Sequence, residues 1–206
     1  IWGGILILGM RIWLGLNLKI IGNYNKDKPC IIAVKHQSAW ETVLCTSLFN
    51  MPSIVLKKDL IYLPIIGLYF LKGRAIPIIR ENTIESLKKI VKMAKINLKK
   101  GSSILIFPQG TRVPLHASTK DYPYQSGIYF LYSQCNIPVI TVAHNAGLFW
   151  PKNSFLKYPN RHKTKTVTLE IMDEIPSGLD KKTFMNRLVK SIEDKTKKLI
   201  EEESDG

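Results

Sequence analysis

The sequence predicts an α/β protein in which a mixed, mostly parallel β-sheet is flanked by helices. Short runs rich in Ile and Val recur along the chain, and segments with the period of an amphipathic helix lie between them. Because strands that alternate with helices build such a sheet, the functional residues are expected in the loops at strand ends. With 206 residues, 45% of them hydrophobic, the chain can form one domain with a substantial core.

The first 22 residues are expected to be a separate, apolar, helical segment that associates with a membrane, ahead of a domain at 23–206. The apolar run "IWGGILILGM" is shorter than the ~20 residues that a spanning helix needs. Trp13 and Lys19 suit a segment that lies in one leaflet, and a buried core helix is the alternative. The chain does not begin with Met, so a truncated start is allowed for.

The elements of the main domain follow from the pattern of apolar residues. Gly101 ends a helix whose apolar side chains recur along one face, in "ENTIESLKKIVKMAKINLKKG". A last amphipathic helix is expected to pack on the domain and to end in the acidic "EEESD". The expected strands are 30–34, 53–56, 75–79, 103–107, 137–143 and 166–172, and the expected helices are 38–49, 81–101, 126–136 and 180–203.

The composition limits the possible partners. Thirty basic and sixteen acidic residues give a formal charge of +14, which predicts an anionic partner: nucleic acid, an anionic membrane or a phosphorylated substrate. The three cysteines have no C-x-x-C spacing, so neither a disulfide framework nor a zinc site is expected. Small buried hydrophobes are the commoner use of such residues, although a Cys paired with a His could also be catalytic.

The stretch "KHQSAWE" holds a candidate catalytic pair, His36 and Glu41. In a continuous helix, five residues would set the two side chains about 140° apart, which is poor for a direct hydrogen bond. Ser38 and Glu41 form a capping box, so the helix is expected to start at this point, with His36 before it. Glu41 could then orient the imidazole, which would act as a general base; the alternative is a cap with a structural histidine.

Three further stretches could contribute to the same site. In "GRAIPIIR", Arg74 and Arg80 flank a short strand, and arginine can bind a phosphate through two parallel donors. In "SSILIFPQGTR", Gly110 allows a sharp turn toward Arg112, which favours an anion site. In "IPVITVAHNAGLFW", a strand-end loop offers Asn145, and the histidine before it is expected to be structural. Each of these stretches alone also fits an ordinary strand end.

Taken together and in this order, the four stretches resemble the blocks of the glycerolipid acyltransferase family, and most closely its bacterial 1-acylglycerol-3-phosphate acyltransferases. The family's His, four residues, Asp block corresponds to His36 through Glu41, and its Phe-Pro-Glu-Gly-Thr-Arg block to "FPQGTR". The Gly-led strand that ends in Arg corresponds to "GRAIPIIR", and the Pro-Val strand with its loop to "IPVITVAHNAGLFW". Glu41 replaces the usual Asp and Gln109 the usual Glu.

This resemblance implies transfer of an acyl chain from acyl-CoA or acyl carrier protein to the sn-2 hydroxyl of lysophosphatidic acid, which gives phosphatidic acid. His36 would be the base and Glu41 its orienting partner. The residues expected to hold the acceptor's phosphate are Arg80, Gly110, Thr111 and Arg112. Those expected to add substrate contacts are Lys57, Lys58, Arg74, Gln109 and Asn145.

No cofactor and no metal are expected, and nucleic acid is not an expected partner. The expected location is the cytoplasmic face of a bacterial inner membrane, where an anionic surface would attract the basic chain. Acylation of glycerol-3-phosphate or of another lyso-lipid remains an alternative within the class. A basic membrane-binding protein without catalysis is the alternative outside it, and this alternative would tolerate loss of His36.

Overall fold

The computed structural model describes residues 8–9, 15–64, 66–78, 84–152 and 165–204. The described residues form a seven-stranded sheet with the strand order β1-β7-β6-β2-β5-β3-β4. All neighbouring pairs are parallel except β6 and β7, which run antiparallel. The strands are β1 (Leu16–Ile21), β2 (Ile31–Val34), β3 (Ser53–Lys57), β4 (Ile76–Ile78), β5 (Ile104–Ile106), β6 (Val139–His144) and β7 (Lys165–Ile171). The predicted mixed, mostly parallel sheet is confirmed.

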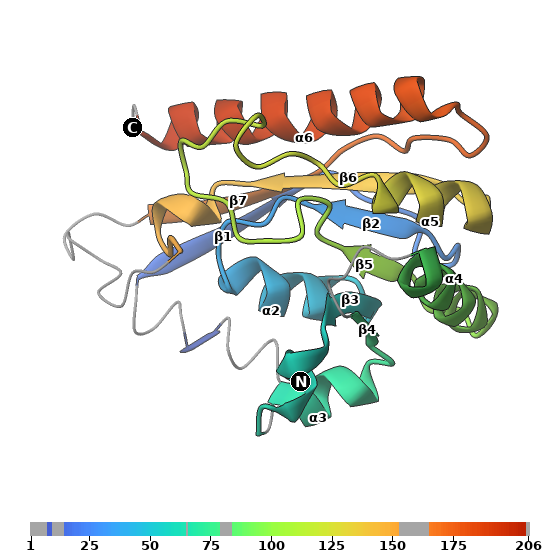
Figure 1. The fold of residues 1–206 in the computed structure, drawn as a ribbon. Coiled ribbons are helices and arrows are strands. Elements are labelled where there is room, and N and C mark those ends of the chain that lie inside the picture. Colours follow the sequence, from blue (N-terminus) through green and yellow to red (C-terminus); the bar gives the residue numbers. More distant parts are fainter. Residues whose placement is uncertain (1–7, 10–14, 65, 79–83, 153–164, 205–206) are drawn as a thin grey trace.

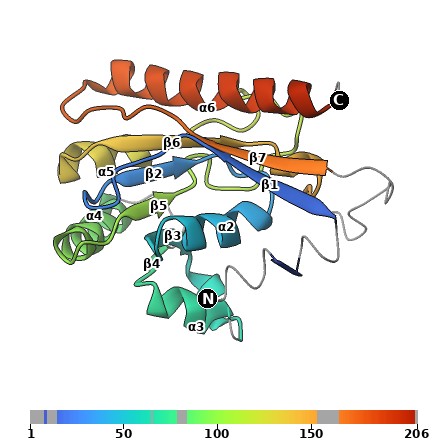
Figure 2. The same cartoon turned by 180° about the vertical axis from the view of Figure 1, so that it is seen from behind.

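Helices cover both faces of this sheet (Figure 1). The long helix α6 runs along one face, and α2 and α3 lie on the other, as the reverse view in Figure 2 also shows. The helices are α2 (Trp40–Leu48), α3 (Ile66–Lys72), α4 (Ile84–Lys99), α5 (Gly127–Cys135) and α6 (Lys181–Ser204), with short 3₁₀ turns η1 (Lys58–Tyr62) and η2 (Ala146–Leu148). None of the helices in the described ranges is both long enough and apolar enough to cross a bilayer.

The two faces of β2 belong to two hydrophobic clusters. Ile32 and Val34 face the cluster that contains Leu44 of α2. Ile31 and Ala33 face the other cluster, which contains Phe184 of α6. All four residues of β2 are fully buried, and their alternation follows from the two-residue period of a strand. The Ile- and Val-rich run that predicted this strand is therefore apolar because both sheet faces are covered.

The N-terminal prediction needs correction at one end. Leu16–Ile21, the last part of the predicted membrane-associating helix, is strand β1, which pairs with β7 in register from Leu16 opposite Lys165. Asn17 and Lys19 are exposed and Leu16 is buried, as expected for alternation on an edge strand. Residues 1–7 and 10–14 of the predicted segment lie outside the described residues. The structure also has η1 and α3, which the sequence did not predict.

Candidate active site

The candidate site lies at the edge of the sheet where the parallel strands β2, β3 and β5 end. His36 follows β2 by two residues, and Phe107 to Gln109 follow β5 directly. Because β2 and β5 are parallel neighbours, these two loops leave the sheet side by side. They border a cavity of about 570 Å³, to which β3, α4 and α5 contribute aliphatic side chains. The location agrees with the rule that sites of open α/β sheets lie at the carboxyl ends of strands.

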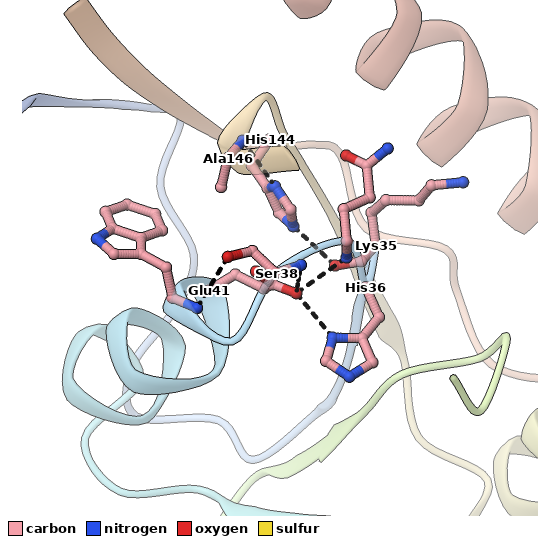
Figure 3. Close-up of polar contacts among 8 residues, drawn as sticks. Lys35, His36, Ser38, Glu41, His144 and Ala146 are labelled. Carbon is pink, nitrogen blue, oxygen red and sulfur yellow. Dashed lines mark hydrogen bonds and ion pairs between the residues drawn. The ribbon is translucent and has the colours of Figure 1, made fainter. Parts of the chain in front are cut away.

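His36 and Glu41 form the predicted pair. His36 Nδ1 lies 2.7 Å from Glu41 Oε1 (Figure 3). The glutamate is fully buried, whereas 18% of the histidine side chain is exposed. The carboxylate therefore accepts from Nδ1–H, which fixes the tautomer in which Nε2 has a lone pair. Nε2 points away from Glu41, and His36 is one of the residues that line the cavity.

The local backbone explains why the pair can meet. Ser38 Oγ accepts a hydrogen bond from Trp40 N–H at 3.1 Å, and Glu41 Oε1 accepts from Ser38 N–H at 2.9 Å. The second bond is the one by which the glutamate of the predicted capping box reaches back to the serine N–H, whereas the serine hydroxyl binds Trp40 N–H instead of the Glu41 N–H that a full box requires. α2 begins at Trp40, one residue later than the box implied. Glu41 Oε1 also accepts from Gln37 N–H at 3.0 Å, so one oxygen holds the turn and the imidazole together.

The imidazole of His36 is held on a second side by Phe107. The two rings are stacked, with centroids 3.9 Å apart and planes 19° from parallel. The carbonyl of His36 accepts a hydrogen bond from Val113 N–H at 2.7 Å, which ties the loop after β5 to the loop after β2. The ring is therefore fixed by a carboxylate at its edge and an aromatic face below it. Sequence reasoning assigned no role to Phe107, although its place directly after β5 made it a neighbour of His36.

His144 supports the backbone that leads into His36. Its Nε2–H donates to the carbonyl of Lys35 at 2.7 Å, and its Nδ1 accepts from Ala146 N–H at 3.2 Å (Figure 3). The side chain is fully buried, and burial lowers the pKa of His144 although the Glu41 carboxylate opposes this. His144 is thus a neutral imidazole with both nitrogens in use. The expectation of a structural histidine agrees with this arrangement.

Lys35 connects the same turn to α6. Its ammonium lies 2.6 Å from Glu193 Oε1, and its side chain is only 3% exposed. Tyr124 donates its hydroxyl to the same Glu193 oxygen at 2.7 Å. Burial and the Glu193 carboxylate raise the pKa of Tyr124 far above its ordinary value, so the phenol remains a donor. Sequence reasoning missed this network because its members are far apart in the chain.

Four of the predicted substrate-binding residues line the cavity with His36: Lys57, Gln109, Gly110 and Thr111. Gly110 has a φ of +70°, a region that glycine enters without a side-chain penalty, as the predicted turn required. Gln109 is buried and donates its Nε2–H to the Tyr122 carbonyl at 2.9 Å. Its Oε1 has no hydrogen-bond partner among the described residues, so the cavity wall contains a buried acceptor.

The other predicted residues lie elsewhere or outside the described chain. Arg112 is half-buried in the loop after β5, but it is not among the residues that line the cavity. Lys58 and Arg74 are exposed and do not line it either. Arg80 lies outside the described residues. Among the described residues, no group of three or more His, Cys, Asp or Glu side chains is arranged to hold a metal ion.

Asn145 is placed differently from its expected role in substrate contact. The side chain is 1% exposed, and its Oδ1 accepts from Thr168 N–H at 2.8 Å. Its Nδ2 donates to the Thr166 carbonyl at 3.3 Å, also on β7. These bonds link the end of β6 to β7, and Asn145 does not line the cavity. The structure gives Asn145 a role in holding the sheet together, because both ends of its amide already bind backbone groups.

Comparison with known proteins identifies the class. Residues 16–145 match the family model described as Acyltransferase, and this range covers more than half of the chain. The chain therefore belongs to the acyltransferase family.

Individual relatives agree with this class. Over 150 residues the chain is 39% identical to a 1-acyl-sn-glycerol-3-phosphate acyltransferase of Pseudomonas aeruginosa, with 72% of this chain and 57% of the relative covered. It is 29% identical over 154 residues to the Saccharomyces cerevisiae protein of the same name, with 69% and 48% covered. The chain thus spans roughly half the length of these curated relatives.

A solved structure has the same fold. The crystal structure of the 1-acyl-sn-glycerophosphate (LPA) acyltransferase from Thermotoga maritima matches with a TM-score of 0.74, over 91% of this chain and 74% of that chain. The sequence identity in this match is 18%, so the match supports the fold alone.

Proposed function

We propose that this protein transfers an acyl chain from an acyl thioester to the sn-2 hydroxyl of 1-acylglycerol-3-phosphate, which forms phosphatidic acid. The observation that carries this proposal is the His36–Glu41 pair, 2.7 Å apart at the wall of a cavity with a largely aliphatic lining. The name of the P. aeruginosa relative supports the choice of acceptor. The donor in this proposal is acyl-CoA or acyl carrier protein.

The proposed reaction starts with proton transfer from the acceptor hydroxyl to His36 Nε2. The oxygen attacks the thioester carbonyl, and the new C–O bond gives a tetrahedral intermediate. Glu41 stabilises the imidazolium that forms, because its carboxylate accepts from Nδ1–H throughout. The intermediate then collapses with loss of the C–S bond, and the imidazolium returns its proton to the leaving sulfur. The products are the new ester and the free thiol, so no other reactant is needed.

The acceptor's phosphate is assigned to the loop after β5. Thr111 lines the cavity next to Gly110, and Arg112 follows in the same loop. Lys57 adds a cation from the end of β3, where it forms an ion pair with Asp59. Arg80 completes the proposed set on the strength of the family resemblance. Guanidinium and hydroxyl donors are well suited to phosphate oxygens.

The apolar part of the cavity is assigned to an acyl chain. Most of its aliphatic side chains come from β3, α4 and α5, and an acyl chain that packs against them would itself leave water, at roughly 25 cal/mol for each Å² buried. The residues concerned are Ile54, Val55, Leu56, Leu87, Ile90, Ile128 and Leu131. The proposed location is the cytoplasmic face of a bacterial inner membrane, since both lipids would be drawn from or returned to a bilayer.

The decisive experiment replaces the proposed base. We expect His36→Ala to lower kcat by roughly 10²- to 10⁴-fold, the usual contribution of a general base, while lysophosphatidic acid still binds. The matched control is His116→Ala, because His116 is exposed and does not line the cavity. The assay follows radiolabelled acyl chains from acyl-CoA and from acyl carrier protein. Unchanged turnover of His36→Ala would refute the mechanism, whereas absence of acyl transfer by the wild type would favour a non-catalytic membrane-binding protein.

A series of acceptors tests the substrate. Lysophosphatidic acid is expected to be the preferred acceptor over glycerol-3-phosphate and over lyso-lipids with larger headgroups. A preference for one of these other acceptors would be compatible with His36 as the base, but it would replace lysophosphatidic acid as the proposed acceptor.

A further inference from the structure

An exposed apolar surface lies on η1 and α3. It consists of Leu60, Tyr62, Leu63, Leu68 and Leu71, here called the η1–α3 surface. Tyr62 and Leu68 are each 72% exposed, and η1 has no buried residue at all. Single exposed apolar side chains are ordinary, but these five occur within twelve consecutive residues. Such a concentration indicates a surface that contacts something apolar.

The η1–α3 surface is presented by a well-packed element rather than by a loose loop. Gly67 of α3 packs so closely on η1 that a Cβ there would lie 1.8 Å from the Ile61 carbonyl oxygen. On the inner side of α3, Phe70 is buried and Tyr69 donates its hydroxyl to Thr46 Oγ1 of α2 at 3.0 Å. Leu68 and Leu71 are three residues apart and so share a helix face, and both are exposed.

Basic side chains border this surface. Lys57 and Lys58 precede it and Lys72 and Arg74 follow it, all exposed, whereas Asp59 is the sole acidic residue from 57 to 74. An apolar face with a basic border matches the chemistry of an anionic lipid leaflet. A second copy of the chain fits less well, because each copy carries a formal charge of +14 and a symmetric contact would bring the basic borders together.

The surface is continuous with the cavity. Leu60 belongs to both, and Lys57 and Phe70, which flank and support the surface, also line the cavity with His36. Figure 1 shows α3 on the α2 side of the sheet, away from α6. A lipid that left a leaflet at this surface would reach the cavity without crossing bulk water.

We infer that the η1–α3 surface docks on an anionic membrane leaflet and positions the cavity to exchange lipid with it. The inference rests on the proposed function in one respect: the docked surface would give a lipid acceptor its route from the leaflet to the cavity. The contact itself is a separate property, because it depends on Tyr62, Leu68 and their neighbours and not on His36.

The test compares the full chain with two variants in vesicle flotation. Tyr62→Ser with Leu68→Ser is expected to weaken partition into phosphatidylglycerol–phosphatidylcholine vesicles by roughly tenfold or more, the scale of one large apolar side chain lost from the bilayer. Ile96→Ser is the matched control, because Ile96 is an aliphatic residue of α4 that is 45% exposed. Equal partition of the double variant and the wild type would overturn the inference.

A label at Leu68 identifies what covers the surface. In a Cys135→Ser background, Leu68→Cys carrying an environment-sensitive dye is expected to shift to the blue when anionic vesicles are added. A shift that instead follows protein concentration without vesicles would overturn the inference in favour of a second copy. Flotation of the chain without any shift would overturn it as well.

Turnover separates this inference from the proposed function. With a short-chain, water-soluble acceptor, the double variant is expected to keep wild-type kcat, whereas with acceptor embedded in vesicles its rate falls with its partition. A rate that fell equally with the soluble acceptor would show that the residues act within the site and would overturn the docking role. If the wild type showed no turnover but floated with vesicles, and the double variant floated less, the proposed enzymatic function would be refuted. The docking inference would then still be supported.

Discussion

His36 Nδ1 and Glu41 Oε1 lie 2.7 Å apart because α2 begins between the two residues and the carboxylate turns back over its own first turn. The same oxygen accepts from the backbone N–H groups of Gln37 and Ser38. Orientation of the imidazole and the start of the helix therefore depend on one atom. A change at Glu41 is expected to affect catalysis and stability together.

Glu41→Asp tests the length of this side chain. Aspartate is one methylene shorter, so at this backbone position it cannot reach all three donors, and we expect kcat to fall roughly ten- to hundredfold as the imidazole loses its alignment. Glu41→Gln keeps the side-chain length and an acceptor oxygen but removes the negative charge. Comparison of the two variants therefore separates the effect of side-chain length from the effect of charge. Steady-state kinetics and urea unfolding of both variants provide the measurement. Wild-type turnover of Glu41→Asp would show that the turn adapts to the shorter side chain.

The Lys35–Glu193 pair is expected to couple α6 to the turn that contains His36. Glu193→Leu leaves a nearly buried ammonium without its carboxylate and is expected to lower the free energy of unfolding by about 2 kcal/mol or more. Lys35→Met combined with Glu193→Leu should recover most of this loss, because no buried charge remains. Tyr124→Phe, which removes one bond to the same carboxylate, should cost about 1 kcal/mol.

Denaturant titrations of Lys35→Met, of Glu193→Leu and of the double variant that combines them form a thermodynamic cycle with the wild type. Additive losses in the double variant would contradict a direct interaction between the two charges.

His144 predicts a dependence of stability on pH. The folded chain holds it neutral, with its pKa lowered by burial, whereas an unfolded histidine takes up a proton near pH 6.5. The unfolded state thus binds more protons below that pH, so the stabilisation is fully present above about pH 6.5 and is lost as the pH falls through the lower, folded pKa.

His144→Gln removes this titration. Its free energy of unfolding should therefore depend less steeply on pH below 6.5 than that of the wild type, although it is lower at pH 8 because a well-placed imidazole is lost. Urea midpoints across this pH range give the comparison. Parallel pH profiles of the two proteins would show that His144 is not the group responsible.

The cysteines are expected to be dispensable for turnover. Burial raises the pKa of Cys30 to about 11, and it raises the pKa of Cys45 and of Cys135 above their ordinary value. At pH 8 only about one Cys30 thiol in a thousand is ionised, so alkylation should be slow and should accelerate as the pH approaches 11. We expect iodoacetamide at pH 8 to leave activity intact and Cys30→Ala to keep kcat within about twofold. Rapid inactivation that tracks labelling of Cys30 would contradict this.

The strands with two covered faces could be predicted well from sequence. Each of β2 to β7 overlaps an expected Ile- or Val-rich run. In β2 and β6 every residue is buried, so burial on both sides leaves a continuous apolar signal. β1 was misassigned, since its "LNLKII" follows an apolar stretch and its edge position leaves only part of it buried. The η1–α3 segment was not foreseen, because its apolar residues are exposed and do not follow the period of a packed helix.

The site was predictable where its residues are local in sequence. The capping box placed Glu41 beside His36 because all its atoms lie within six residues. The partners of Lys35 and Asn145 could not be predicted, because they come from α6 and β7 and depend on how distant elements pack. Both Thr111 and Arg74 are expected from the sequence to contact the substrate. The structure distinguishes them, because Thr111 lines the cavity and Arg74 does not.

The ion pair between Lys35 and Glu193 has a consequence for the order in which the chain matures. Glu193 follows Lys35 by 158 positions, so the ribosome makes the lysine well before its partner. Until α6 has emerged, the Lys35 ammonium lacks the Glu193 carboxylate, so burial of Lys35 beside His36 is disfavoured. A nascent chain that stops before α6 is therefore expected to leave the turn around His36 loosely packed until α6 has been synthesised.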